Sequence, residues 1–179
     1  MMGSERKIIA IDGRCASGKT TLAQELGAYL GAGIVHMDDF FLPAWLRTPE
    51  RLSQPGGNVH YERFLEEVMP ALRKSQAFFY RKFDCSAMQL TKTVEVAASP
   101  YRIVEGAYSQ HPAFSDYADI RIFCDIEPEW QLSRILERNG EEALRVFKER
   151  WIPMEEQYFR EYEIRQRADY VVFCSKGEK

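Results

Sequence analysis

The residues best suited to chemistry lie in a glycine-rich segment near the start of the chain. Gly13-Arg-Cys-Ala-Ser-Gly18-Lys19-Thr20 has the spacing G-x-x-x-x-G-K-[ST]. In this pattern backbone N–H groups surround phosphate oxygens, the lysine reaches the outer phosphates and the threonine hydroxyl is placed to bind Mg²⁺. The segment therefore predicts a phosphate-binding loop with ATP and Mg²⁺ as cofactors; the alternative is a glycine-rich turn without a ligand. The residues expected to hold the nucleotide are Gly13, Ala16, Ser17, Gly18, Lys19, Thr20 and Thr21.

Acidic residues follow two further apolar segments. Asp38 and Asp39 come after residues 34–37, and Glu105 comes after residues 101–104. Open α/β sheets bind ligands at the carboxyl ends of their strands. An alcohol that accepts a phosphoryl group needs a carboxylate to orient its hydroxyl and take its proton, and a second acid commonly helps to hold the metal. Asp38 is the candidate base; the alternative is that the aspartates cap a helix and Glu105 pairs with a cation. The residues expected to hold the metal are Thr20, Asp38 and Glu105.

Two arginines and two aromatic residues are further candidates. Arg134 and Arg138 are four residues apart on one helix face. Phosphoryl transfer needs cations over the transferring group, often from a mobile lid, so residues 134–150 are a candidate lid, with Arg138 as a catalytic cation and Arg134 as a substrate-binding one. A solvated charged face is the alternative. Phe40 and Tyr80 are candidates to touch an acceptor ring, and core packing is their alternative.

Composition and missing motifs exclude several other classes of protein. The net charge of -3 argues against a nucleic-acid backbone as the main partner. No apolar run approaches the length of a membrane span. The four cysteines form no C-x-x-C pair, which favours a reduced, cytoplasmic setting. Neither N-K-x-D nor D-x-x-G occurs, so a switch GTPase is disfavoured. The sequence leaves open whether the chain forms a homo-oligomer.

The periodicity of the chain predicts the elements that must position these residues. Short apolar segments at 7–11, 34–37, 101–104, 120–124 and 170–174 predict strands. Helical patterns lie between them, at 19–30, 61–75 with a kink at Pro70, 128–138, 141–151 and 154–167, the last two separated by Pro153. Residues 78–98 are expected to be strands or extended chain. Alternating strands and helices predict an α/β fold with three layers, a five-stranded mainly parallel sheet, helices on both faces and a short lid.

The length of 179 residues predicts a single domain that spans residues 1–179. Within it, the irregular segment of about 40–100 is expected to be an insertion that holds the acceptor.

Together these segments resemble a known group of enzymes. The phosphate-binding loop, Met37-Asp38-Asp39-Phe40-Phe41, Val104-Glu105-Gly106 and Arg134-x-x-x-Arg138 look like those of the uridine kinase family, and more widely of the pantothenate kinase and phosphoribulokinase group of P-loop kinases. The resemblance implies that Asp38 is the base for a nucleoside 5′-hydroxyl, that Glu105 belongs to the magnesium shell and that Arg138 and Arg134 are lid arginines. Uridine kinases usually have D-S-F-Y where this chain has Asp38-Asp39-Phe40-Phe41.

These observations predict an ATP-dependent small-molecule kinase. It would transfer the γ-phosphate to a hydroxyl of a nucleoside acceptor similar to uridine or cytidine. Two alternatives stay open: a kinase for another alcohol, such as a pantothenate-like acid or a sugar, and a regulatory nucleotide-binding protein in which Asp38 is structural.

Overall fold

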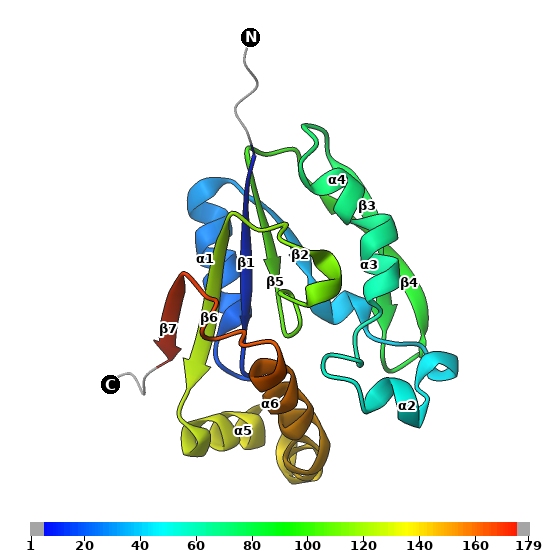
Figure 1. Ribbon diagram of the computed structural model, residues 1–179, viewed down its shortest axis with the longest axis vertical. Coiled ribbons are helices and arrows are strands. Elements are labelled where there is room, and N and C mark those ends of the chain that lie inside the picture. The colour runs from blue at the N-terminus through cyan, green and yellow to red at the C-terminus, as the bar shows by residue number, and fades with distance from the viewer. Residues whose placement is uncertain (1–5, 175–179) are drawn as a thin grey trace.

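A five-stranded parallel sheet forms the centre of the molecule. The computed structural model describes residues 6–174. The sheet order is β2-β5-β1-β6-β7, and every neighbouring pair is parallel. The strand arrows run toward one edge, beside which α5 and α6 lie (Figure 1). The strands are β1 (Lys7–Gly13), β2 (Gly33–His36), β5 (Tyr101–Glu105), β6 (Ile120–Ile126) and β7 (Tyr170–Cys174). All five predicted strands are therefore present.

Both faces of the sheet are covered, which confirms the three-layer α/β prediction. On one face, α1 (Lys19–Leu30) packs through Ala23 and Gly27, while Leu22, Leu26 and Leu30 flank this contact. A Cβ on Gly27 would lie 2.7 Å from Cδ1 of Ile34, so the small residues bring the helix close to the sheet. The opposite face carries a larger aromatic cluster that includes Phe64, Phe114, Phe123 and Tyr158. Burying apolar strands from both sides is what continuous β-branched runs require.

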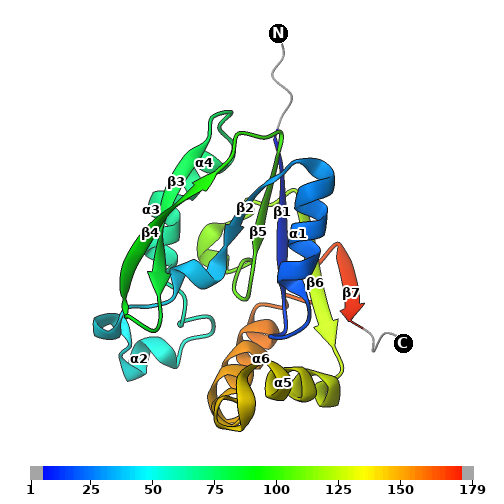
Figure 2. The ribbon, with the colours of Figure 1, turned by 180° about the vertical axis from the view of Figure 1, so that it is seen from behind.

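The segment 40–100 forms a helical turn region and a separate hairpin beside the β2 edge of the sheet (Figure 2). Its elements are α2 (Pro49–Leu52), α3 (Tyr61–Glu67), α4 (Met69–Leu72), β3 (Phe78–Asp84) and β4 (Gln89–Val96). Residues 78–98, predicted as strands or extended chain, form the strands β3 and β4, and these two strands pair antiparallel. The predicted helix over 61–75 breaks at Val68 and ends at Leu72, because Pro70 lacks an N–H and is placed in the first turn of the short α4.

The C-terminal helices differ from the prediction in two places. Helix α5 (Pro128–Val146) is kinked at Gly140, where φ is 81°, and this kink lies between the patterns predicted at 128–138 and 141–151. The expected separation of two helices at Pro153 is wrong. A short π-helix, Phe147–Trp151, connects α5 to α6 (Ile152–Glu161) without a break. Pro153 lies in the first turn of α6, the position that tolerates a missing N–H. Helix α6 ends at Glu161 rather than at residue 167.

No helix in the part of the chain that the structure describes is both long enough and apolar enough to cross a bilayer.

Candidate active site

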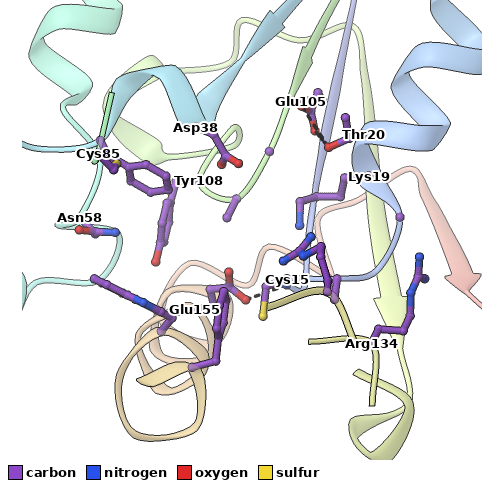
Figure 3. Close-up of a pocket in the computed structure, with 18 of the residues that line it drawn as sticks. Cys15, Lys19, Thr20, Asp38, Asn58, Cys85, Glu105, Tyr108, Arg134 and Glu155 are labelled. Atoms are coloured by element: carbon purple, nitrogen blue, oxygen red, sulfur yellow. Dashed lines mark hydrogen bonds between the residues drawn. The ribbon is translucent and has the colours of Figure 1, made fainter. Parts of the chain in front are cut away.

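A cavity of about 680 Å³ opens beside the carboxyl ends of the strands (Figure 3). One side, the P-loop wall, consists of Cys15, Ala16, Gly18, Lys19, Thr20 and Thr21. The facing side, the insertion wall, consists of Asp38, Phe41, Arg47, Asn58 and Cys85. Glu105 to Tyr108 join the two walls, and α5, the π-helix and α6 contribute Arg134, Glu137, Arg138, Phe147, Trp151 and Glu155. The candidate residues from distant parts of the sequence thus meet at one edge of the sheet.

The P-loop wall depends on two glycines for different reasons. Gly13 has a φ of 131°, and a Cβ there would lie 2.1 Å from the backbone oxygen of Cys124 in β6. Gly18 has a φ of 89° with open space where its Cβ would be. The first glycine therefore permits close contact with the sheet, and the second permits the left-handed turn that starts α1. Gly13 and Ser17 lie behind the cavity lining, so they shape the loop rather than face the cavity.

Lys19 and Thr20 carry the polar side chains of this wall. The Lys19 ammonium group donates to the backbone oxygens of Gly13 at 2.8 Å and Arg14 at 2.7 Å. The hydroxyl of Thr20 lies 3.3 Å from Oε2 of Glu105. Glu105 is 4% exposed, and its Oε1 lies 2.5 Å from Nδ1 of His36. That hydrogen bond is the main cause of the raised pKa of His36, with burial acting against it.

The two consecutive aspartates after β2 have different environments. Asp38 faces the open cavity and is exposed, yet the protein around it desolvates the carboxylate and raises its pKa. Glu105 and Asp39 add to this rise, while Lys19 and His36 oppose it. A raised pKa is typical of a carboxylate that takes up a proton in catalysis.

Asp39 points away from the cavity and is 3% exposed. It accepts a hydrogen bond of 2.8 Å from the hydroxyl of Tyr80, and the ammonium group of Lys82 lies 3.2 Å from its Oδ1. The second aspartate is therefore structural: it ties the turn after β2 to the hairpin strand β3.

The expectation that Phe40 and Tyr80 touch an acceptor ring is wrong for this structure. Phe40 is fully buried, with its ring centroid 5.2 Å from that of Phe64 and 5.1 Å from that of Tyr80. Tyr80 is 2% exposed, and neither residue lines the cavity. The turn Met37–Phe40 directs Asp38 to the cavity and Phe40 to the core. Tyr80, from β3, packs against Phe40 on the core side. The aromatic residues that do line the cavity are Phe41, Tyr108, Phe147 and Trp151.

Both predicted lid arginines line the cavity, and within residues 6–174 neither forms a hydrogen bond or ion pair with the P-loop. The Arg134 guanidinium donates to Sγ of Cys174 at 2.7 Å and lies on the far side of Lys19 from Asp38 (Figure 3). Arg138 is exposed, and its Nε donates to Oδ1 of Asn139 at 2.8 Å. The kink at Gly140 lies between these arginines and the part of the helix that leads into α6.

Asp12, which directly precedes the P-loop, is a positioning residue that sequence reasoning missed. It is fully buried and accepts hydrogen bonds from the backbone N–H groups of Gly13 at 2.7 Å, Tyr108 at 3.2 Å and Gln110 at 3.0 Å. The hydroxyl of Tyr158 donates to it at 2.8 Å. Burial raises the pKa of Asp12, and these hydrogen bonds lower it in part. Its place at the end of a strand, like that of Asp38, was the available signal.

Glu155 in α6 was also missed. It is 6% exposed, lines the cavity and accepts a hydrogen bond of 2.9 Å from the backbone N–H of Cys15. Gln131 donates to the carbonyl oxygen of the same cysteine at 3.0 Å. These contacts join residues more than 100 positions apart, so no local pattern indicates them. Together they fix the first half of the P-loop against α5 and α6.

The residues around Thr20 fit a magnesium ion. Mg²⁺ prefers hard oxygen ligands and usually combines one or two protein groups with phosphate oxygens and water. The hydroxyl of Thr20 and the carboxylate of Glu105 already lie within hydrogen-bond distance of each other, and the charge of Asp38 acts on the same region. Within residues 6–174 no cluster of three or more His, Cys, Asp or Glu side chains forms a metal cage. The oxygen donors of Thr20 and Glu105 are of the kind that fits a metal shared with phosphates.

Comparisons with known proteins identify the fold. No family model and no curated protein matched the chain. A solved structure from Bacillus stearothermophilus, assigned provisionally as a uridine kinase, is 22% identical with a TM-score of 0.67, covering 96% of this chain and 91% of the other. One from Silicibacter sp. TM1040, assigned provisionally as a fructose transport system kinase, is 24% identical with a TM-score of 0.70, covering 95% and 91%.

A D-glycerate 3-kinase from Cryptococcus neoformans is 16% identical with a TM-score of 0.61, covering 86% of this chain and 79% of the other. These three structures thus carry kinase names that refer to different compounds. The resemblance seen in the sequence is confirmed at the level of architecture: the chain has the P-loop kinase fold.

Proposed function

We propose that the protein is a kinase that transfers the γ-phosphate of ATP to the hydroxyl of a small alcohol. The observation that carries this proposal is the position of Asp38 across the cavity from Lys19, with Thr20 and Glu105 beside them (Figure 3). A nucleotide-binding protein without an acceptor needs the P-loop wall alone. A carboxylate with a raised pKa on the facing wall is what proton removal from an alcohol requires.

Each wall has a separate task in this reaction. The P-loop amides and Lys19 hold the β- and γ-phosphates, since a helix N-terminus and an ammonium group both favour anions. Mg²⁺, held by Thr20 and Glu105, supplies charge neutralisation at the phosphate oxygens. Asp38 orients the acceptor hydroxyl and takes its proton as the oxygen attacks phosphorus in line with the departing ADP. Arg138 and Arg134, which line the same cavity, add positive charge over the transferring phosphoryl group.

The acceptor follows less directly from these residues. The resemblance to uridine kinases supports a nucleoside such as uridine or cytidine, and the wider group supports pantothenate-like acids or sugars. Three solved structures with this fold carry names that refer to uridine, fructose and D-glycerate. The alcohol hydroxyl is the feature that these acceptors share, and it is the group that Asp38 would face.

A coupled assay of ADP release across nucleosides, hydroxy acids and sugars tests the proposal. We expect ADP release that depends on one class of alcohol and on Mg²⁺. Lys19→Ala should reduce it by about 100-fold to 1,000-fold, because a group that stabilises the transferring phosphoryl is removed. The same variant should lose the increase in melting temperature that MgATP produces.

Lys74→Ala is the matched control, since Lys74 is an exposed lysine outside the cavity. MgATP binding without any alcohol-dependent ADP release would contradict the kinase and favour a regulatory nucleotide-binding protein.

A further inference from the structure

The insertion wall contains a cation that the phosphoryl-transfer residues do not explain. Arg47 follows a 3₁₀ turn (Ala44–Leu46), is half-buried and lines the cavity. Its Nε donates to the backbone oxygen of Leu42 at 2.8 Å, which fixes the direction of the guanidinium. No carboxylate among the described residues lies within ion-pair distance of it.

Two other arginines of the segment 40–100 have carboxylate partners, unlike Arg47. Arg51 pairs with Glu62 at 2.7 Å, and Arg63 pairs with Glu67 at 3.4 Å. Both are mostly buried and have protein carboxylates as partners. A half-buried guanidinium whose terminal N–H groups face a cavity gains most from an anionic ligand, since its planar fork matches a carboxylate or a phosphate.

Arg47 belongs to the acceptor side of the cavity rather than to the nucleotide side. It lies close enough to Cys85 to lower the pKa of that thiol, although burial has the larger, opposite effect. Figure 3 shows Cys85 and Asn58 on the far side of Asp38 from Lys19 and Thr20. A phosphate chain held by the P-loop and an anion held by Arg47 would therefore lie on opposite sides of Asp38.

Two further polar groups lie beside this position. Asn58 is 4% exposed and lines the cavity, and its Oδ1 is buried without a hydrogen-bond partner among residues 6–174. The amide nitrogen of Asn58 is directed toward the Tyr108 hydroxyl, whereas Oδ1 points the other way (Figure 3). Burial raises the pKa of Tyr108 well above its usual value, so the hydroxyl stays a donor. Asn58 and Tyr108 therefore add polar groups to the same part of the cavity lining as Arg47.

We propose that the acceptor alcohol carries an anionic group, a carboxylate or a phosphate, which binds to Arg47 with Asn58 and Tyr108 as neighbouring hydrogen-bonding groups. This inference rests on the proposed kinase function and narrows its acceptor. Asp38 would engage the hydroxyl to be phosphorylated, and Arg47 would bind the charge at the other end of the molecule. An uncharged nucleoside would leave the guanidinium without a counter-ion in a partly desolvated site, which is unfavourable.

Matched pairs of alcohols that differ in one charge test the inference. The pairs are pantothenate with pantothenol, glycerate with glycerol, and orotidine with uridine; glycerol 3-phosphate replaces glycerate to separate phosphate from carboxylate. We expect kcat/KM for the charged member of one pair to exceed that of its neutral partner by at least 10-fold. Arg47→Gln should abolish this preference by lowering kcat/KM for the charged member, while leaving KM for ATP unchanged, since the charged end of the acceptor loses its partner. Arg47→Lys should restore part of it.

Arg81→Gln is the matched control, because Arg81 is an exposed arginine of β3 that does not line the cavity. A neutral member that is preferred, or a preference that survives Arg47→Gln, would overturn the inference and leave the kinase intact. If no alcohol stimulates ADP release, the proposed function fails instead. Binding of an anion at Arg47 is then tested by thermal shift with 10 mM of each charged probe, on the order of a weak ligand's dissociation constant: a probe that stabilises the natural protein and not Arg47→Gln supports the anion site alone, and equal or no stabilisation of the two proteins overturns it.

Discussion

The two walls of the cavity are built in different ways. The P-loop wall comes from one short segment of the chain, Cys15 to Thr21. The groups of this segment that would bind phosphate are mainly backbone N–H groups, together with the side chains of Lys19 and Thr20. The insertion wall consists of side chains that come from a 3₁₀ turn, two loops and a hairpin between Asp38 and Cys85. A wall of backbone amides accepts any phosphate, because every residue supplies the same donor. A wall of separate side chains changes its ligand when one residue changes.

This difference assigns chemistry to one wall and selectivity to the other. Substitutions in the P-loop wall should act through loop shape and affect all acceptors equally. On the other side, two sets of residues should respond differently to substitution. Asp38 and Arg47 belong to the insertion wall and line the cavity, whereas Asp39 and Tyr80 lie behind that wall and support it.

The largest effect is expected at the close contact between the P-loop and β6. Gly13→Ala places a Cβ within 2.1 Å of the Cys124 backbone oxygen at a φ of 131°, so either the loop or the strand must shift. We expect a loss of at least about 3 kcal/mol in the free energy of unfolding, from overpacking and backbone strain together. Urea denaturation without nucleotide measures it.

Gly18→Ala separates these two causes. Its φ of 89° is also left-handed, but nothing lies within 4 Å of the added Cβ. We expect a loss of only about 1 kcal/mol, from the conformation alone. Equal losses for the two variants would show that the contact with β6 does not determine the effect.

The next largest effect tests whether adjacent aspartates have separate roles. Asp38→Asn should reduce acceptor-dependent kcat/KM by about 100-fold without a change in melting temperature, because it removes the base and no packing contact. Asp39→Asn should do the reverse: it weakens the contacts with Tyr80 and Lys82, so the melting temperature falls while kcat/KM stays within about threefold. A loss for Asp38→Asn of less than threefold would remove Asp38 as the base.

The sequence predicts the P-loop wall almost completely and the insertion wall only in part. Gly13 to Thr20 are consecutive, so local spacing defines the loop, and the strand-end rule places Asp38 and Glu105 at the same edge. The direction of a side chain is different, because it depends on the turn that carries it. Phe40 and Tyr80 face the core, and Arg47 faces the cavity from a segment without helix or strand periodicity. Glu155 reaches Cys15 across 140 positions, which no local pattern can indicate.

A third prediction concerns the support behind the P-loop wall. Asp125 in β6 accepts hydrogen bonds from Arg14 of the P-loop at 2.7 Å and from Arg165 at 2.9 Å. Burial acts to raise the pKa of Asp125, but these hydrogen bonds outweigh it and hold the pKa below its usual value. Asp125→Asn should therefore cost about 2 kcal/mol in the free energy of unfolding at neutral pH.

The pH dependence of this cost has a defined sign. Because the folded pKa is lowered, the stabilisation is present above the ordinary pKa of an aspartate and is lost as the pH falls through the lower, folded value. The difference between the natural protein and Asp125→Asn should accordingly shrink on acidification below about pH 4. Asp116→Asn is the control, since Asp116 is 77% exposed and its ion pairs with Arg121 and Arg167 should contribute less than about 0.5 kcal/mol. A cost at Asp125 that is constant down to pH 2 would mean that the ion pairs do not cause it.

The smallest effect is expected for Tyr80→Phe, which tests whether a residue behind the insertion wall affects acceptor binding. Tyr80→Phe removes one hydroxyl, 2.8 Å from Oδ2 of Asp39, and leaves the ring contact with Phe40 in place. The free energy of unfolding should fall by about 1 kcal/mol, the usual net contribution of a hydrogen bond, because Lys82 still pairs with Asp39. Acceptor KM and kcat should both stay within about twofold, since Tyr80 is 2% exposed and does not line the cavity. A rise in acceptor KM with unchanged stability would mean that the hydroxyl turns toward the acceptor, so that the boundary between the two sets of residues moves when the acceptor binds.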